Sequence, residues 1–325
     1  MLTTLINAMK GVGGTIADWA GVCPAPLSGE GYRVVVVTGC DNECGFGRKL
    51  SLRLLERGYI VICSCFSRKT AQLYNEKDDG MIAFGGDLTD RATMDKFVEL
   101  IQTTLHRNDE YVLWGLVNNA GVAIPSNIEW AHPDTYLQTM AVNFHVHITL
   151  TYHLLPIVKR NKGSRIVNVS SVCGLVPLPM CPSYTASKHA LEAYSDVLRC
   201  EMSIWGVHVS LIEPGTMATQ LGTSHFDDWL KSYNNAPEIR KRDYGQEWAD
   251  NVHATGIEGA KSIACNPDIA VHDMLLAVTS KRPKTRYRSG FLAKYFFRPL
   301  AWVPDRWRDW FLFKMMYKAT PGTLQ

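Results

Sequence analysis

The stretch VVVVTGCDNECGFGRKL, residues 34–50, decides the fold. Its four consecutive valines form an apolar run without alternation, which is typical of a strand buried on both faces of a parallel sheet. Gly39, Gly45 and Gly47 follow, and then a segment of helical period begins. A strand that passes through a glycine loop into a helix is the arrangement that binds a dinucleotide pyrophosphate at the helix N-terminus. The glycines are spaced G-x5-G-x-G, however, which is wider between the first two than such loops usually are.

Strands and helices alternate along the chain after Tyr32. The pattern predicts strands over 34–38, 59–66, 114–121, 164–171 and 207–215, and helices over 46–57, 91–106, 134–160 and 184–205. Apolar strands that alternate with helices predict an α/β fold, here a single doubly wound parallel-sheet Rossmann domain with helices on both faces. The rhythm is lost from about residue 216. We therefore expect three parts: an N-terminal arm (1–30), a catalytic core (31–222), and a substrate-covering lid with a C-terminal tail (223–325).

The bulk composition narrows the class of protein. The chain has 325 residues, of which 46% are hydrophobic and 20% charged, as in an ordinary folded protein. A net charge of +3 is too small to indicate nucleic acid as a partner. The nine cysteines are odd in number and form no paired C-x2-C framework, which predicts free thiols in a reducing, intracellular compartment. His145, His147 and His153 do not make a ligand set, so we expect no metal site.

Both ends of the chain suggest contact with a membrane. The first 22 residues are amphipathic, and they lie either on a membrane or on the protein body; they contain no uninterrupted apolar run of about 18 residues that could span a bilayer. The tail 291–318 is rich in aromatic and basic residues, which favours peripheral association with a membrane interface. The alternative is that its aromatic rings cap the substrate pocket or pack in a dimer. The tail residues that carry this expectation are Trp302, Trp307, Trp310, Phe311 and Phe313, with Arg306, Arg308 and Lys314 beside them.

Ser171, Tyr184 and Lys188 form the pattern that carries chemistry. Tyr184 follows Ser171 by thirteen residues, and Lys188 lies four residues later on the same face of a predicted helix. A free tyrosine has a pKa of about 10 and is a poor base at neutral pH. An ammonium about 4 Å away favours the phenolate by about 4 kcal/mol at an effective dielectric of about 20. We therefore expect Lys188 to lower the pKa of Tyr184 into a range useful for acid/base catalysis, although Y-x3-K alone is also a common surface pair.

Further motifs occur with this pattern in a fixed order. They are TGCD (38–41), GFG (45–47), DLT (87–89), NNAG (118–121), VNF (142–144), NVSSVCG (168–174), YTASK (184–188) and EPGTMAT (213–219). In this order they resemble the short-chain dehydrogenase/reductase family over about residues 32–222. The segments ALEAYSDVLRCEMSIWGVHVSLIEPG and LLAVTSKRPKTRYRSGFLAKYFFRPLAWVPD resemble most the branch of retinol, 17β- and 11β-hydroxysteroid, and 3-hydroxybutyrate dehydrogenases.

The resemblance implies a role for each matching residue. Tyr184 would be the acid/base, Lys188 would tune it and bind the nicotinamide ribose, Ser171 would orient the substrate oxygen, and Asn143 would hold a water that links Lys188 to solvent. Ser170 is a rival for the serine role, but the spacing to the tyrosine favours Ser171. The cofactor-binding set would be Gly39, Gly45, Phe46, Gly47, Asp87, Asn119, Ala120, Gly121, Tyr184, Lys188, Pro214, Gly215 and Thr219.

Against the family pattern, the glycine loop is two residues longer, with Asn42 and Glu43 as the insertion. We expect a stretched but working loop, because the helix N-terminus can still offer N–H groups to phosphate, provided that Glu43 points to solvent. The alternative is weakened cofactor binding. The cofactor is NAD(H) or NADP(H). No acid follows the second strand, and Arg68 or Lys69 could meet a 2′-phosphate, which would suit NADP(H). The branch that the chain resembles, however, includes NAD users with a similar Cys-apolar-hydroxyl triplet, which gives a slight lean to NAD(H).

The resemblance implies an oxidoreductase that interconverts an alcohol and its carbonyl on a lipophilic substrate, such as a steroid or a retinoid. The alternatives are a small hydroxy-acid dehydrogenase and a weakly active cofactor-binding scaffold. We also expect a homodimer or a homotetramer, with the choice between them left open. We expect a membrane-associated intracellular protein of the endoplasmic reticulum, with the mitochondrion as the alternative.

Overall fold

The computed structural model describes residues 32–77 and 80–316, so the arm expected at 1–30 lies outside the described residues. Seven strands form one parallel sheet in the order β3-β2-β1-β4-β5-β6-β7. The strands are β1 (Tyr32–Val37), β2 (Ile60–Cys65), β3 (Met81–Gly85), β4 (Tyr111–Asn118), β5 (Arg165–Val169), β6 (His208–Pro214) and β7 (Arg286–Ser289). The order reverses between β1 and β4, and in open parallel sheets ligands bind outside the carboxyl ends of the strands at such a switch point.

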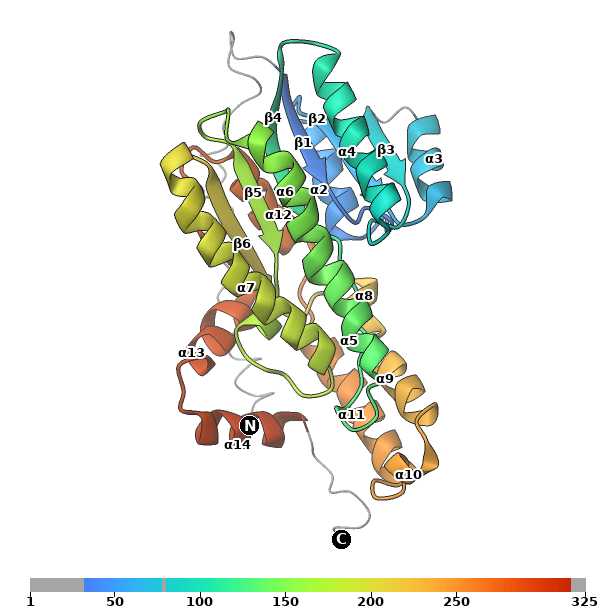
Figure 1. Ribbon diagram of the computed structural model, residues 1–325. Coiled ribbons are helices and arrows are strands. Elements are labelled where there is room, and N and C mark those ends of the chain that lie inside the picture. Colours follow the sequence, from blue (N-terminus) through green and yellow to red (C-terminus); the bar gives the residue numbers. More distant parts are fainter. Residues whose placement is uncertain (1–31, 78–79, 317–325) are drawn as a thin grey trace.

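Helices cover both faces of the sheet (Figure 1). One buried cluster packs α2 (Phe46–Leu55), α3 (Arg68–Glu76) and α12 (Asp268–Thr279) against one face. A second cluster packs α4 (Arg91–His106), α6 (Val146–Val158) and α7 (Pro182–Met202) against the other. The predicted doubly wound Rossmann architecture is therefore confirmed.

The segment after residue 222 has two parts. One part returns to the sheet, because α12 packs on it and β7 pairs with β6. The other part consists of helices beyond the carboxyl edge of the sheet, with α14 near α13, and the end of α14 at Met316 packs against the aromatic cluster of α9 and α11 (Figure 1). These helices are α8 (Gln220–Thr223), α9 (His225–Asn234), α10 (Glu238–Lys241), α11 (Gln246–Ile263), α13 (Arg298–Leu300) and α14 (Asp305–Met316). The segment expected to form only a lid and tail thus also completes the sheet.

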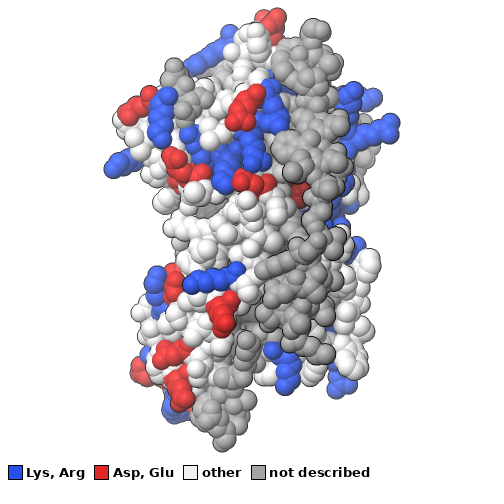
Figure 2. Space-filling view, turned by 180° about the vertical axis from the view of Figure 1, so that it is seen from behind, with Lys and Arg blue, Asp and Glu red and all other residues white. Residues whose placement is uncertain are grey.

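On the back of the molecule, ion pairs join α2 and α12. Asp268, in the first turn of α12, accepts from Lys49 at 3.3 Å and from Arg53 at 3.0 Å. All three side chains are partly exposed, so each pair contributes little to stability. Figure 2 shows Lys and Arg side chains gathered in the upper part of this face, with acidic side chains among them.

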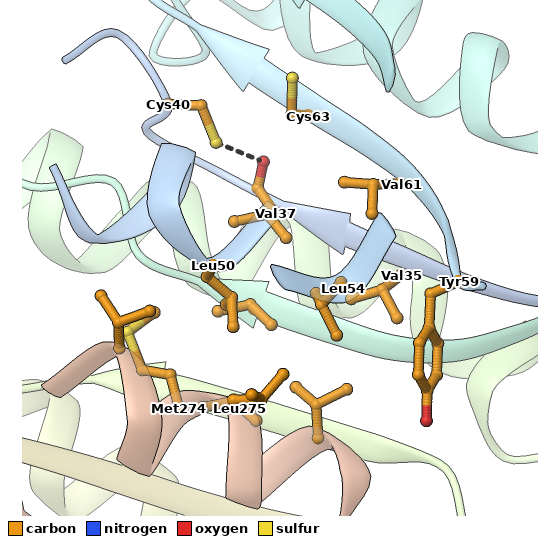
Figure 3. Packing of buried hydrophobic residues seen from close by; sticks show 14 of the residues in the cluster. Val35, Val37, Cys40, Leu50, Leu54, Tyr59, Val61, Cys63, Met274 and Leu275 are labelled. Atoms are coloured by element: carbon orange, nitrogen blue, oxygen red, sulfur yellow. Dashed lines mark hydrogen bonds between the residues drawn. The ribbon is translucent and has the colours of Figure 1, made fainter. Parts of the chain in front are cut away.

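The inner sides of the same two helices build the core. Leu50 and Leu54 of α2 point towards Met274 and Leu275 of α12 and towards the valines of β1 (Figure 3). Both leucines are fully buried, and each contributes about 1.5–3 kcal/mol relative to an exposed side chain. This packing fixes the start of α2, and with it the glycine loop. Within residues 32–77 and 80–316, no helix has the length and apolar character needed to cross a membrane.

Candidate active site

The turn after β1 packs against the end of β4. Gly39 has a φ of +74°, and a Cβ there would lie 2.7 Å from the Cα of Ala120, so only glycine fits. The hydroxyl of Thr38 accepts the N–H groups of Asn119 and Ala120, each at 3.0 Å. The amide of Asn119 in turn donates to the Thr38 carbonyl at 2.8 Å. These bonds hold together the two loops that flank the switch point.

The N-terminus of α2 is open towards this turn. Gly45 is the N-cap residue, and no side chain caps it. The next residues, Phe46 and Gly47, form the first turn, whose N–H groups have no partner within a helix. A Cβ on Gly47 would lie 2.5 Å from the Gly39 carbonyl oxygen. The glycines therefore create a close backbone cradle at a positive helix end, which is suited to a phosphate group.

The two inserted residues form a turn on the rim of this cradle. Asn42 closes the turn, because its carbonyl accepts the Gly45 N–H at 2.9 Å. Its side-chain amide reaches across to Gln220 at 2.7 Å. The carboxylate of Glu43 is 67% exposed and pairs with Lys77 at 3.3 Å. Glu43 thus faces solvent, which is the condition under which a stretched loop can still accept phosphate.

The serine, tyrosine and lysine of the sequence pattern converge next to β5. Ser171 follows the strand and caps a short 3₁₀ turn, where its hydroxyl accepts the Cys173 N–H at 3.2 Å. Tyr184 and Lys188 lie one turn apart on α7. The Lys188 side chain is buried and donates to the Val169 carbonyl at 2.8 Å. Its Nζ lies 5.5 Å from the centre of the Tyr184 ring.

The electrostatics of this pair differ from the expectation. The pKa of Tyr184 is raised above its usual value by burial and then by Cys173, while the Ser171 hydroxyl opposes the rise. Burial lowers the pKa of Lys188 to about 8, although Cys173 and Glu192 partly offset it. The expected lowering of the Tyr184 pKa by Lys188 is therefore wrong for this structure. The main cause is desolvation of the phenol, and Lys188, whose ammonium bonds to a carbonyl, is not among the groups that lower the pKa of Tyr184.

Asn143 lies on a π-helical turn, η2 (Ala141–His145), between α5 (Pro133–Met140) and α6. Its buried amide accepts the Val122 N–H at 2.8 Å and donates to the Val122 carbonyl at 2.9 Å. The same amide donates to Ser187 of α7 at 3.0 Å. Gly121 lies between, since a Cβ there would be 3.5 Å from Asn143 Oδ1 and 3.7 Å from Lys188 Nζ. π-Helical turns occur often at functional sites.

The other predicted cofactor residues lie at the same edge of the sheet. Asp87 follows β3, is exposed, and accepts the Thr89 N–H at 2.9 Å. Pro214 is the last residue of β6, and the Gly215 N–H donates to the Ser289 carbonyl at 3.0 Å. Thr219 is the N-cap of α8. The predicted residues therefore follow β1, β3, β4, β5 and β6 at one edge.

Sequence reasoning missed two polar features beside this site. Asp41 lies in the glycine loop, but its carboxylate reaches the backbone that follows β2. Glu192, one turn after Lys188, forms an ion pair with Arg286 of β7. The TGCD motif and the acid four residues after the lysine were visible signals. Their partners were not, because they come from distant parts of the chain.

An apolar groove of about 780 Å³ adjoins α7. Tyr184 is not part of its lining, although the neighbouring Thr185 is, so the groove lies beside the tyrosine and does not contain it. Leu178 and Met180 form part of its wall. Behind Met180, Trp229 and Trp248 belong to a buried aromatic cluster. Within the described ranges, no group of three or more His, Cys, Asp or Glu residues is placed to hold a metal ion.

Comparison with known proteins identifies the family. A family model for short chain dehydrogenases matches residues 33–229. Human 17-beta-hydroxysteroid dehydrogenase type 6 is 35% identical over 284 residues, which are 86% of this chain and 87% of the relative. Retinol dehydrogenase 7 of Rattus norvegicus is 34% identical over 278 residues, which are 84% of this chain and 85% of the relative.

Solved structures share the fold at lower identity. A short-chain dehydrogenase from Streptomyces avermitilis superposes with a TM-score of 0.64 at 23% identity, covering 82% of this chain and 91% of that one. The 3-ketoacyl-(acyl-carrier-protein) reductase from Brucella melitensis, complexed with NADH, gives a TM-score of 0.59 at 21% identity, covering 77% and 91%. The chain is an oxidoreductase that belongs to the short-chain dehydrogenase/reductase family.

Proposed function

We propose that the protein is an NAD(P)-dependent alcohol dehydrogenase or ketone reductase acting on a lipophilic substrate of the steroid or retinoid type. The observation that carries the proposal is the convergence of Ser171, Tyr184 and Lys188 beside the glycine cradle. Both lie at the carboxyl edge of one parallel sheet, where a cofactor and a substrate can meet.

The glycine cradle fits a dinucleotide. The positions where a Cβ would clash are those where a pyrophosphate needs close approach to the backbone, and the helix end beside them is uncapped. When bound, the dinucleotide supplies or accepts the hydride. The residues that would hold it are Gly39, Gly45, Phe46, Gly47, Asp87, Asn119, Ala120, Gly121, Tyr184, Lys188, Pro214, Gly215 and Thr219.

The chain itself supplies the proton chemistry. The raised pKa keeps Tyr184 protonated at neutral pH, so its hydroxyl can give a proton to a carbonyl oxygen. In the reverse direction the phenolate must form, and the nearby Lys188 ammonium stabilises that charge. Ser171 orients the same substrate oxygen. Asn143 ties the Val122 loop to α7, which fixes the helix that carries the tyrosine.

The surroundings support a lipophilic substrate. The groove beside α7 is mainly apolar, and the aromatic cluster behind it gives a rigid apolar wall. The names of the relatives, a hydroxysteroid and a retinol dehydrogenase, point to the same chemical class. We propose that helices α8 to α11 act as the substrate lid. A hydroxy acid would instead need a cationic anchor.

We further propose that the protein associates peripherally with a membrane, that of the endoplasmic reticulum in the first place, and that it is a homodimer or homotetramer. The support for membrane association is the aromatic surface near α14. Trp302, Trp307 and Trp310 are 72%, 69% and 58% exposed. Exposed aromatic rings beside basic residues suit an interface with lipid.

A turnover screen tests the proposed function. Purified protein is incubated with hydroxysteroids, retinol and 3-hydroxybutyrate, each with NAD⁺ and with NADP⁺, and dinucleotide reduction is followed by absorbance. The proposal expects turnover of a steroid or a retinoid. Turnover of 3-hydroxybutyrate alone would reassign the substrate class. Dinucleotide binding without turnover of any alcohol or ketone would favour the scaffold.

A further inference from the structure

The carboxylate of Asp41 is held in place by two backbone bonds. Its Oδ2 accepts the Phe66 N–H at 2.9 Å, and its Oδ1 accepts the Ser67 N–H at 2.8 Å. Asp41 itself belongs to the glycine loop after β1, whereas Phe66 and Ser67 follow β2. The contact thus joins the ends of two adjacent strands of the sheet.

The Asp41 carboxylate lies where dinucleotide folds distinguish NAD(H) from NADP(H). In dinucleotide folds, the residue that selects between the two nicotinamide cofactors follows the second strand and faces the ribose 2′-position. The residues there are Phe66, Ser67, Arg68 and Lys69, and none is acidic. The first loop therefore delivers to this place the acid that the second loop lacks.

We propose that Asp41 selects NAD(H) over NADP(H), because its carboxylate lies where the 2′-hydroxyl of the adenosine ribose would bind. The inference rests on the proposed function, which requires a bound dinucleotide. Each carboxylate oxygen uses one lone pair for an N–H and keeps another, which can accept a ribose hydroxyl. The two backbone bonds hold it ready for this contact.

A 2′-phosphate would meet two obstacles at the same place. The first is the negative charge of Asp41, which repels the phosphate. The second is that the two N–H groups best placed to bind phosphate oxygens already donate to Asp41. Arg68 and Lys69 attract phosphate, but both are exposed in the first turn of α3, where solvent screens them. Asp41 is half-buried and fixed, so its repulsion prevails.

The test compares dinucleotide affinities by calorimetry or fluorescence, without substrate. Wild-type protein should bind NADH at least about 100-fold more tightly than NADPH, which is about 2.7 kcal/mol. Asp41→Asn keeps the shape but removes the charge, and Asp41→Ser removes both the charge and the second oxygen. Each variant should reduce the preference by at least about tenfold. Glu43→Gln removes the other acid of the loop and should leave the preference unchanged.

Several outcomes would overturn the inference. If wild-type protein binds NADPH as tightly as NADH, the inference is wrong. This outcome needs no variant, so the test remains valid even if the variants fail to fold. An unchanged preference in folded Asp41→Asn and Asp41→Ser proteins would also contradict it. Binding of neither dinucleotide would reject the proposed function itself, and with it this inference. Tight binding without turnover would leave the inference standing and reject only the activity.

Discussion

At the scale of single residues, burial sets the chemistry of the site more than charge does. Tyr184 and Lys188 lie one helical turn apart, yet burial raises the pKa of the phenol and lowers that of the ammonium to about 8. Both shifts favour the neutral forms, as desolvation always does. Without a cofactor, Tyr184 therefore holds its proton and is arranged to donate it to a substrate oxygen.

Replacing Tyr184 with phenylalanine tests the role of that proton. The variant removes only the hydroxyl, so turnover should fall by at least about 1000-fold, the middle of the range for general acid–base catalysis. Dinucleotide affinity should stay within about threefold, since ring packing is kept. Lys188→Ala serves as the comparison and should impair both turnover and binding. Equal loss of turnover and affinity in Tyr184→Phe would make the tyrosine a structural residue.

At the scale of elements, two features depend on contacts between segments distant in the sequence. The stretched loop rests on Gln220 of α8 and on Lys77 at the end of α3. Helix α7 is tied to β6 and β7 by Arg286, which pairs with Glu192, Asp196 and Glu213. Each feature yields a prediction.

Deleting Asn42 and Glu43 restores the family spacing of the glycine loop. The deletion removes the exposed contacts of Asn42 with Gln220 and of Glu43 with Lys77, together with the turn that Asn42 closes, but it keeps Gly45 and Gly47 at the helix start. Dinucleotide affinity, measured by titration, should therefore change by less than about tenfold, or about 1.4 kcal/mol. Glu43→Gln is the control for loss of charge alone. A gain well beyond tenfold would show that the native loop impairs binding.

The buried acid Glu192 predicts a dependence of stability on pH. Burial first, and then Glu213, raise its pKa from 4.5 to about 7 in the folded protein. Between pH 4.5 and pH 7, Glu192 keeps a proton in the folded state that it has lost in the unfolded state. The preference of the folded state for this proton stabilises the fold at low pH, and the contribution is lost as pH rises through 7. The shift corresponds to up to about 3 kcal/mol. The melting temperature of wild type should therefore fall relative to that of Glu192→Gln between pH 5 and pH 8.

The exposed Glu201 on the same helix gives the matched control. Glu201→Gln should melt in parallel with wild type over this pH range. A constant difference between wild type and Glu192→Gln would mean that Glu192 ionises normally in the folded protein.

At the scale of the whole molecule, the sequence predicts the sheet better than its surroundings. Strands β1, β2, β4, β5 and β6 were predicted from their mainly apolar runs, whereas β3, which reads MIAFG, was not predicted. β7 reads RYRS and carries no such signal. Its two arginines are accommodated in the sheet because acids from α7 and β6 neutralise them. The π-helical turn at Asn143 and the helices of 220–263 also escaped prediction, because long-range packing sets them. The roles of the site residues stay predictions.

The exposed tail predicts membrane binding. Trp307, Trp310 and Phe313 are 69%, 58% and 51% exposed, whereas Phe311 packs against Phe296 at 5.6 Å. Each exposed ring would contribute on the order of 2 kcal/mol when it is buried in lipid. Full-length protein should sediment with anionic liposomes and be released only partly by high salt, since salt screens charges but not apolar burial.

The variant that replaces Trp307, Trp310 and Phe313 with serine should stay in the supernatant while keeping its fold. Tyr152→Ser, an equally exposed aromatic on α6, should sediment like wild type. If wild-type protein stays in the supernatant with anionic liposomes, the membrane interpretation is wrong. The tail aromatics would then be assigned to the substrate pocket or to a dimer contact.

The central claim is hydride transfer between a lipophilic alcohol and a dinucleotide, with Tyr184 moving the proton. The most direct measurement uses a hydroxysteroid or retinol that carries deuterium on its carbinol carbon, incubated with NAD⁺ and analysed by mass spectrometry. We predict that wild-type protein gives reduced dinucleotide that carries the deuterium, and that Tyr184→Phe gives none above background. Ketone or aldehyde formed without deuterium in the dinucleotide, or unimpaired transfer by Tyr184→Phe, would contradict the account.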